Sequence, residues 1–341
     1  MRVGILAPIS HRFPPDGYGP WERVASDLAE GLVELGVDVT VFAADDAVTS
    51  AVLEPTVPTS LEDAPAADPR LWETYHIAVA FRRAVELGLD VVHSHLHVHA
   101  LGYGPLLPMP LVTTLHGSAW NEAHHPFLSA YADFPFVSLS DAERRFLPGL
   151  NYVATVPNGI RLEQFPVGDG GERLVFVGRM APEKAPDLAV EVARRSGFPL
   201  TLAGRIEEQY RDFFEAEVRG RLEGDIEYVG ELSSADVAHL VGSSAALLMP
   251  LRWDEPFGLV VAESLAVGTP VIAWRRGAMP ELIADGETGF LVDDVEGALD
   301  AVGRLGDIDR KRCRLEAEER LSHRVMAERY AAVYRRLTPS R

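Results

Sequence analysis

The sequence predicts an α/β protein with two domains, each built on a doubly wound parallel β-sheet. Short apolar runs alternate with longer amphipathic stretches along most of the chain, which is the pattern of parallel strands covered by helices. The chain has 341 residues, more than a single hydrophobic core usually organises. A polar, glycine-rich stretch at 166–172 separates two series of these runs.

The first series contains runs so apolar that both faces of the strands they form should be buried. We expect these strands at 3–7, 37–43, 91–93 and 111–115. We expect helices at 21–35 and 81–87. The stretch 45–69 is rich in Ala, Pro and acids, interrupts the alternation and predicts a surface loop.

The second series repeats the alternation. Strands are expected at 174–178, 199–203, 226–229, 246–249 and 270–273, and helices at 186–195, 209–222, 234–242, from Pro256 and from about 297. A last helix at 322–337 has apolar residues on one face, so it should pack on another element. We therefore place one domain at 1–167 and a second at 168–321, with 322–341 packing back on the first.

The composition excludes several classes of partner. Lys and Arg number 32 and Asp and Glu 51, so the formal net charge is −19, which argues against nucleic acid and anionic membrane surfaces. No apolar stretch approaches the ~20 residues of a membrane span, so we expect no integral membrane contact. The single cysteine, Cys313, excludes an internal disulfide and fits a reducing compartment. We expect a soluble, cytoplasmic protein that is a monomer or a homodimer.

Two basic side chains follow the predicted strand 174–178. Gly178, Arg179 and Lys184 lie on the loop at the carboxyl end of that strand, where open α/β sheets bind ligands. The planar guanidinium of Arg179 can donate two hydrogen bonds to a phosphate group. The compact ammonium group of Lys184 can add a positive charge beside it. The alternative is that both are surface charges paired with Glu183 or Asp187.

Two acids surround the start of another predicted helix. Pro256 suits the first helical turn, so the amides of Phe257, Gly258 and Leu259 should be free to bind oxygens of a ligand. Glu255 would lie just before this helix and Glu263 about two turns into it, ~12 Å further along. The alternative is that each acid is a solvated residue near a helix end.

The first domain offers Gly19 and His116. Gly19 follows the first strand, but the loop lacks the G-x-G-x-x-G spacing and the Gly-Lys-Ser/Thr of a P-loop. His116 follows the strand 111–115, and its alternative is a satisfied structural histidine. The histidines at 93, 95, 97 and 99 look like a metal tract, but the further ligands of a zinc site are lacking, so we expect no metal.

At this point the sequence resembles the family 4 glycosyltransferases, which are retaining enzymes of GT-B fold, over nearly its whole length. The landmarks are Gly19 with Glu22 and Arg23, His116-Gly117, Val156-Pro157-Asn158-Gly159-Ile160, Val177-Gly178-Arg179, Pro182-Glu183-Lys184, Glu255-Pro256-Phe257-Gly258 with Glu263, Gly268 to Ala273, Pro280-Glu281 and Gly286 to Val292. The resemblance implies two Rossmann-like domains facing across a cleft, the first for the acceptor and the second for a nucleotide sugar.

The resemblance also implies a role for each matching residue. Arg179 and Lys184 would grip the diphosphate, and Glu263 would receive the ribose hydroxyls. Glu255 and the amides of Phe257, Gly258 and Leu259 would hold the transferred sugar. His116 would lie beside the anomeric centre, and Gly19 would let its loop close on the phosphates. The base pocket would be lined by Gly204, Arg205 and Ile206.

The implied reaction moves a hexose from a nucleoside-diphosphate sugar, with UDP-glucose as the expected donor, to a hydroxyl of a small-molecule, glycan or lipid acceptor. It would proceed by front-face displacement with retention, without a metal or another cofactor. Two interpretations compete with it. One is a sugar-nucleotide epimerase, which shares the two-sheet architecture, and the other is a non-catalytic two-domain protein that closes on a nucleotide.

Overall fold

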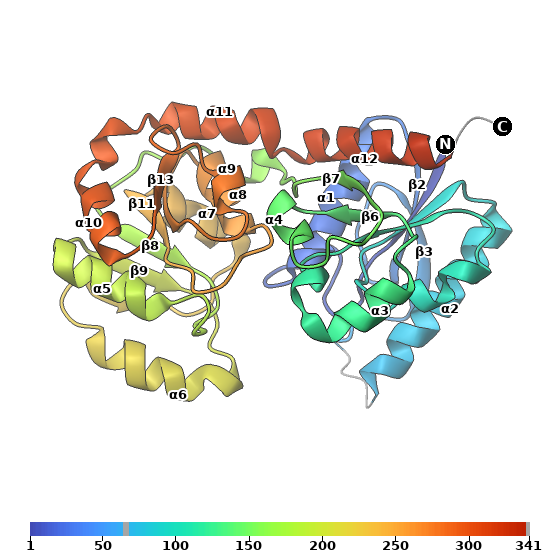
Figure 1. The fold of residues 1–341 in the computed structure, drawn as a ribbon, viewed down its shortest axis with the longest axis horizontal. Coiled ribbons are helices and arrows are strands. Elements are labelled where there is room, and N and C mark those ends of the chain that lie inside the picture. Colours follow the sequence, from blue (N-terminus) through green and yellow to red (C-terminus); the bar gives the residue numbers. More distant parts are fainter. Residues whose placement is uncertain (64–67, 339–341) are drawn as a thin grey trace. The chain divides into compact units, whose positions relative to one another are not determined.

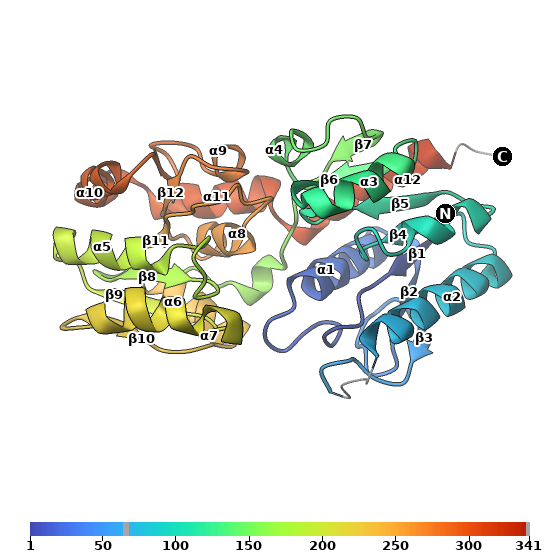
Figure 2. The same cartoon turned by 60° about the horizontal axis from the view of Figure 1, so that its bottom comes forward.

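The structure, a computed structural model, describes residues 1–63 and 68–338 of the chain (Figure 1). The chain divides into two compact units. Unit 1 is Met1–Ile160 with Ser322–Arg341, and unit 2 is Arg161–Leu321. In both units helices lie on both faces of a parallel sheet, so the predicted fold class is confirmed (Figure 2).

The boundary between the units follows Ile160, whereas the sequence placed it after residue 167. Residues 161–167 belong to unit 2 because the backbone of this stretch accepts a hydrogen bond from a unit 2 side chain. Arg314 donates to the carbonyl oxygens of Phe165 and Ala266, at 2.8 Å each. Gly168, directly after this segment, donates its N–H to the carbonyl oxygen of Val267.

Unit 1 contains a seven-stranded sheet with the order β3-β2-β1-β4-β5-β6-β7. Its strands are β1 Arg2–Leu6, β2 Asp38–Ala44, β3 Val52–Val57, β4 Val91–Ser94, β5 Leu111–Thr114, β6 Phe136–Ser138 and β7 Tyr152–Thr155. Its α-helices are α1 Pro20–Glu34, α2 Pro69–Leu87, α3 His125–Ala130, α4 Asp141–Arg144 and α12 His323–Leu337. The apolar runs that predicted strands form the centre of this sheet, β2, β1, β4 and β5.

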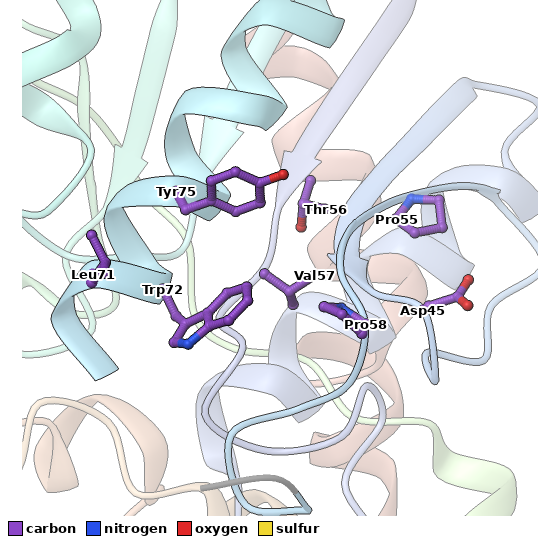
Figure 3. A pocket seen from close by; sticks show the side chains of 8 residues that line it. All are labelled: Asp45, Pro55, Thr56, Val57, Pro58, Leu71, Trp72 and Tyr75. Carbon is purple, nitrogen blue, oxygen red and sulfur yellow. The ribbon is translucent and has the colours of Figure 1, made fainter. Parts of the chain in front are cut away.

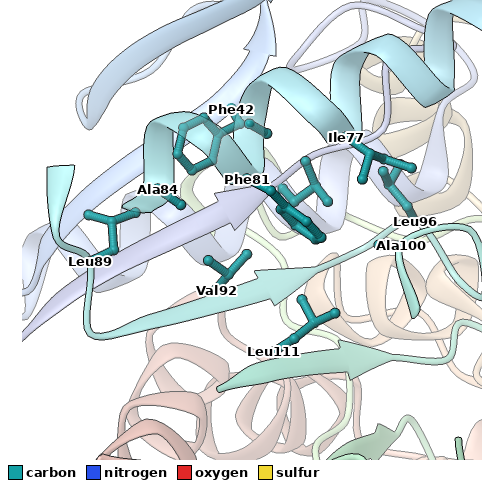
Figure 4. Packing of buried hydrophobic residues seen from close by; sticks show 11 residues of the cluster. Phe42, Ile77, Phe81, Ala84, Leu89, Val92, Leu96, Ala100 and Leu111 are labelled. Atoms are coloured by element: carbon teal, nitrogen blue, oxygen red, sulfur yellow. The ribbon is translucent and has the colours of Figure 1, made fainter. Parts of the chain in front are cut away.

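Helix α2 covers one face of this sheet through an apolar cluster (Figure 4). Ile77 and Phe81 of α2 pack with Phe42 of β2 and Val92 of β4, and all four side chains are buried. The helix begins after Asp68, whose carboxylate accepts the N–H of Leu71 as an N-cap. The cluster packs the middle and end of α2 against β1, β2 and β4.

Strand β3 lies inside the stretch 45–69, so the prediction of a loop there was wrong for these residues. β3 pairs with β2 in parallel and forms the edge of the sheet. Its sequence contains Glu54 and Pro55, which an edge strand tolerates because one side has no hydrogen-bonding neighbour. Such a strand lacks the apolar run that marks a central one. Residues 64–67 of the predicted loop lie outside the described residues.

Helix α12 packs along α1 of unit 1 (Figure 1). The two helices approach closely at Gly31 of α1, where a Cβ atom would come within 2.9 Å of the Ala327 Cβ. Tyr330 and Tyr334 of α12 are fully buried. The side chain of Ser322 caps the helix by accepting the N–H of Val325. The C-terminal segment is therefore part of the core of unit 1.

Unit 2 contains a six-stranded sheet with the order β10-β9-β8-β11-β12-β13. Its strands are β8 Leu174–Val177, β9 Leu200–Ala203, β10 Ile226–Tyr228, β11 Ala246–Met249, β12 Val271–Trp274 and β13 Gly289–Val292. Its α-helices are α5 Pro186–Ser196, α6 Arg211–Phe213, α7 Ser234–Gly242, α8 Leu259–Ala266, α9 Met279–Leu282, α10 Val295–Gly303 and α11 Arg310–Arg320.

The helix predicted at 209–222 is not a regular α-helix. Only α6 is α-helical, and a π-helical turn at Phe214–Val218 and a 3₁₀ turn at Arg219–Arg221 follow it. Phe214 and Val218 are both fully buried, so the wider turn keeps these two side chains in the core.

Candidate functional site

The predicted residues of unit 2 gather on loops at one edge of its sheet. Arg179 follows β8, Arg205 follows β9 and Glu255 lies on the loop after β11. Strands β9, β8 and β11 are consecutive neighbours in the sheet, so the carboxyl ends of all three meet at the same edge. The structure therefore brings these charged side chains into one region.

Arg179 is held between two carboxylates. Its guanidinium donates to Glu183 at 2.8 Å and to Glu207 at 3.1 Å. Arg205 donates to the other oxygen of Glu207 at 2.7 Å. The alternative interpretation was correct about the contact between Arg179 and Glu183. Asp187 instead accepts a bidentate pair from Arg252 at 2.7 and 2.5 Å.

Lys184 is paired with Glu255. Its ammonium nitrogen hydrogen-bonds the Oε2 atom of Glu255, and the same oxygen accepts Nε1–H of Trp253 at 3.0 Å. The ammonium group also lies 5.0 Å from the centre of the Trp253 ring. Glu255 is buried. Three side chains thus fix one another, so the positive charge of Lys184 has a defined position.

The backbone around Glu255 is clamped by the turn before α9. Ala278 donates its N–H to the Glu255 carbonyl at 2.9 Å, and Gly277 donates to the Asp254 carboxylate at 3.0 Å. A Cβ atom on Gly277 would lie 2.3 Å from the Glu255 carbonyl oxygen, so only glycine fits there. The position of Glu255 depends on this close approach.

Helix α8 begins later than the sequence predicted. Its first residue is Leu259, and Gly258 is the N-cap with a φ of 95°. That left-handed conformation cannot continue into a helix, so Pro256 and Phe257 precede α8 instead of forming its first turn. Glu263 is therefore about one turn into the helix, ~6 Å along its axis, and not two turns. Leu259 remains a first-turn amide.

The loops after β8 and β9 touch through their backbones. Gly204 has a φ of 139°, and a Cβ atom there would lie 1.9 Å from the carbonyl oxygen of Gly178. Tyr228 donates its hydroxyl hydrogen to the Gly204 carbonyl at 2.7 Å. Gly178 and Gly204 thus hold the loops of Arg179 and Arg205 together, and Ile206 on the second loop is half-buried.

In unit 1, Gly19 precedes α1 in a position that only glycine can occupy. Its φ is 156°, and a Cβ atom would lie 2.8 Å from the Cβ of Pro15. Its carbonyl accepts the N–H of Arg23 at 3.0 Å and so begins the helix. The loop therefore packs against itself at Gly19.

His116 lies two residues after the end of β5 and has a φ of 48°, in the left-handed region. Its Nε2 lies 2.9 Å from Nδ1 of His95. The carboxylate of Glu143 accepts the N–H of Gly117 at 2.6 Å and that of Leu139 at 2.8 Å. A non-glycine residue in this conformation is strained, and these contacts hold it in place.

Burial controls the protonation of this region. It lowers the pKa of His116 well below its ordinary value, with a further contribution from the neighbouring rings of His95 and His97. Burial raises the pKa of Glu143 to about 7, although two N–H groups stabilise its charged form. His116 is therefore neutral at pH 7.

The histidine tract does not form a metal centre. β4 ends at Ser94, so only His93 lies on the strand. His97 bonds the Leu115 carbonyl and the Ser118 hydroxyl, whereas His99 points to Glu73 at 3.9 Å. Within residues 1–63 and 68–338, no group of three or more His, Cys, Asp or Glu side chains could hold a metal ion.

Sequence reasoning missed three residues that support the site: His95, Glu143 and Glu207. His95 lay in the tract that was weighed only as a metal site. Glu143 was recognisable as the last residue of Ser140-Asp-Ala-Glu, the pattern of a helix capping box. Nothing in the sequence marked Glu207, because its pairing depends on the loop that carries it.

A separate hollow of about 600 Å³ lies in unit 1 at the carboxyl ends of β2 and β3 (Figure 3). It is lined by Asp45, Pro55, Thr56, Val57, Pro58, Leu71, Trp72 and Tyr75. Trp72 and Tyr75 belong to the first turns of α2 and are partly exposed. Gly19 and His116 do not line this hollow.

Across the part of the chain that the structure describes, no helix has the length and apolar character needed to cross a membrane. Cys313 is buried and hydrogen-bonds the Thr288 carbonyl, and burial raises the pKa of its thiol to about 12. The thiol is therefore not a nucleophile at neutral pH.

Two family models match the chain, one for each half. The model described as "Glycosyltransferase Family 4" matches residues 21–164, and the model described as "Glycosyl transferases group 1" matches residues 162–320. The matches meet close to the boundary between unit 1 and unit 2. Together they include His116 and every charged residue of the unit 2 region described above.

The chain is also similar to proteins of known name. The glycogen synthase of Mycobacterium tuberculosis is 27% identical, over 88% of this chain and 85% of that protein. The phosphatidyl-myo-inositol mannosyltransferase of Mycolicibacterium smegmatis is 28% identical, over 95% and 89%. Among solved structures, Anabaena Alr3699/HepE in complex with UDP-glucose has a TM-score of 0.72 and 16% identity, over 97% of this chain and 98% of that one.

Proposed function

Since the chain belongs to the family 4 glycosyltransferases, whose GT-B fold it has, we propose that it transfers a hexose from a nucleoside-diphosphate sugar to an acceptor hydroxyl. We propose UDP-glucose as the donor and retention of the anomeric configuration. The observation that carries the proposal is the grouping of Arg179, Lys184 and Glu255 at one edge of the unit 2 sheet.

The leaving group explains why two cations are needed. As the bond between C1 of the sugar and the phosphate oxygen breaks, negative charge grows on the diphosphate. Arg179 and Lys184 supply positive charge to it, and the N–H groups at the start of α8 add the positive end of a helix. The acceptor oxygen bonds to C1 on the same face, and the leaving phosphate oxygen takes the acceptor proton. No step of this scheme requires a metal ion.

In this scheme, the carboxylates that pair with Arg179 and Lys184 hold both cations in place before the donor binds. Glu183 and Glu207 hold the guanidinium of Arg179, and Glu255 holds the ammonium group of Lys184. A diphosphate with its higher charge competes with these carboxylates for the same donors. The carboxylates therefore keep the cations in position and are exchanged for phosphate oxygens when the donor binds.

The remaining residues take the parts that their positions allow. Glu255 and the N–H of Leu259 lie at the start of α8 and would contact the sugar, while Glu263, one turn further, would receive the ribose hydroxyls. Gly204, Arg205 and Ile206 would line the base pocket. In unit 1, His116 would contact the sugar near its anomeric carbon, and Gly19 would let its loop approach the phosphates.

The identity of the sugar rests on the named relatives. Glycogen is a polymer of glucose, and the similarity to a glycogen synthase therefore supports a glucose donor. The mannosyltransferase relative points to mannose instead, with a lipid acceptor. Anabaena HepE, of similar fold, binds UDP-glucose. We propose glucose with uridine as the base, and the acceptor as a small molecule, glycan or lipid.

The experiment measures nucleoside diphosphate released from UDP-, ADP- and GDP-sugars in the presence of an acceptor panel. We expect the fastest release from UDP-glucose. Lys184→Ala should lower turnover about a hundredfold, equivalent to ~3 kcal/mol of transition-state stabilisation. Glu263→Ala should also lower turnover. The matched control is Lys311→Ala, which removes an exposed lysine of α11 and should leave turnover unchanged.

Two outcomes would contradict the proposal. Undiminished turnover in both Lys184→Ala and Glu263→Ala would exclude a role for the unit 2 region in catalysis. A donor incubated without acceptor that is converted to its epimer would replace transfer by epimerisation as the reaction.

A further inference from the structure

The ring of His116 is connected to a second buried imidazole. His95 follows β4 and His116 follows β5, and these strands are parallel neighbours with Ser94 paired to Thr113. The two rings therefore lie side by side at the same edge of the sheet, with 2.9 Å between Nδ1 of His95 and Nε2 of His116. His95 is completely buried, and 8% of the surface of His116 is exposed.

The position of the His95 ring is fixed from the other side. The ring of His93 lies 4.2 Å from it, between centroids. His93 is itself anchored, because Nδ1 bonds the hydroxyl of Tyr334 and Nε2 bonds that of Thr114, both at 2.7 Å. The Thr114 hydroxyl also bonds Tyr330. Two tyrosines of α12 thus anchor His93 and Thr114 beside the His95 ring.

Only one of the two nitrogens that face each other can carry a hydrogen while both rings are neutral. If Nε2 of His116 carried it, His95 would bear its own hydrogen on Nε2. That atom is buried and has no hydrogen-bond partner among the residues that the structure describes. A buried N–H without an acceptor is rarer than a buried acceptor without a donor. The hydrogen therefore belongs on Nδ1 of His95, which donates to Nε2 of His116.

This assignment determines what His116 offers to a ligand. With its Nε2 accepting from His95, the neutral ring carries its hydrogen on Nδ1. No hydrogen bond to Nδ1 of His116 is found within the described part of the chain. Burial lowers the pKa of both rings, so neither becomes charged near pH 7.

We propose that His95 is a positioning residue that fixes His116 as the neutral tautomer with its hydrogen on Nδ1. His116 then presents an N–H donor, and not a proton-accepting base, to an oxygen atom of the bound sugar. The contact between His116 and the sugar rests on the proposed function, whereas the assignment of the His116 tautomer does not.

The tautomer is tested by long-range ¹H–¹⁵N correlation NMR on the ¹⁵N-labelled full chain, with His116→Gln to assign the signals. In the wild type, Nδ1 of His116 should be the protonated nitrogen. His95→Asn places an amide nitrogen near the position of Nδ1 and should keep this tautomer. His95→Leu removes the donor and should give a mixture of tautomers.

The matched control is His76→Leu, which removes another fully buried histidine of unit 1, one that bonds Thr56 and the Ala7 carbonyl. It should leave the tautomer of His116 unchanged. A wild-type spectrum with the hydrogen on Nε2 would overturn the proposal, as would an unchanged tautomer in His95→Leu. If His95→Leu does not fold, the wild-type spectrum and His95→Asn still decide the question.

Kinetics then test the consequence for transfer. Losing one positioned hydrogen bond should lower kcat/KM for the active donor about tenfold in His95→Leu. His95→Asn should restore most of it, and the Kd of the nucleoside diphosphate, which has no sugar, should not change. If the wild type transfers no sugar, the proposed function fails while the tautomer result stands. If it transfers sugar and His95→Leu keeps its kcat/KM, only the role of His95 fails.

Discussion

At the scale of single residues, Glu207 is the shared partner of two cations. It binds Arg179 at 3.1 Å and Arg205 at 2.7 Å, at the edge where the diphosphate should bind. In the proposed function, Glu207 gives up at least one of these partners when the diphosphate binds. Its charge therefore opposes binding, even though its hydrogen bonds hold both arginines in place.

We expect Glu207→Gln to bind the nucleoside diphosphate about fivefold more tightly, because partly exposed ion pairs are worth up to ~1 kcal/mol. Isothermal titration calorimetry measures this change. The matched control is Glu208→Gln, whose carboxylate pairs with Arg211 on the surface and should not affect binding. Weaker binding in Glu207→Gln would show that positioning of the arginines outweighs the competition.

At the scale of elements, helix α2 is fastened to the sheet by a buried histidine. His76 bonds the Thr56 hydroxyl of β3 at 2.5 Å and the carbonyl of Ala7, just after β1, at 2.9 Å. Burial lowers the pKa of His76 from 6.5 to about 4. The folded state therefore binds the proton less readily than the unfolded chain does.

The pH dependence of stability follows from this shift. The contribution of neutral His76 is fully present above pH 6.5 and is lost as the pH falls from 6.5 towards 4. Since one pKa unit is worth about 1.4 kcal/mol, the loss amounts to roughly 3 kcal/mol. Urea unfolding at several pH values should show a shallower fall in His76→Leu than in the wild type. Equal slopes in the two proteins would contradict the assignment.

The central strands could be predicted because burial on both faces favours a continuous apolar run, as in β8 and β11. Edge strand β3 was not predicted, because only two of its six residues are buried and the others need not be apolar. The start of α8 was misplaced because Pro256 is a good first helical residue, whereas the left-handed turn at Gly258 is a tertiary outcome.

For the candidate site, the sequence predicts the positions of single residues but not the contacts between them. Arg179, Lys184 and His116 could be placed at strand ends from the order of runs alone. Their partners could not. The pair of Lys184 with Glu255 joins loops 71 residues apart, and that of His95 with His116 depends on the register of β4 and β5. Such contacts are fixed by how the loops fold, which local sequence patterns do not report.

At the scale of the whole molecule, the chain order makes unit 2 an insertion in unit 1. Unit 2 is the continuous stretch Arg161–Leu321, whereas unit 1 needs segments from both ends of the chain. Helix α12 buries Tyr330 and Tyr334 against the rest of unit 1, and each large buried side chain is worth about 2–3 kcal/mol.

We therefore expect residues 161–321 to fold alone, with a cooperative thermal transition followed by circular dichroism. A chain ending at residue 321 should lose the transition of unit 1, because α1 is uncovered and His93 loses its bond to Tyr334. Adding a peptide of residues 322–338 should restore part of it. An unchanged unit 1 transition in the shortened chain would show that α12 is dispensable.

The bridge between Ile160 and Ser322 brings together the two points where the chain leaves and re-enters unit 1. They touch so closely that a Cβ atom on Gly159 would lie 2.4 Å from the Ser322 carbonyl oxygen. Everything between these points forms one cassette with adjoining ends. A gene segment for the same stretch of another member of the family can be spliced in at these two positions without cutting a strand, and donor preference should travel with it.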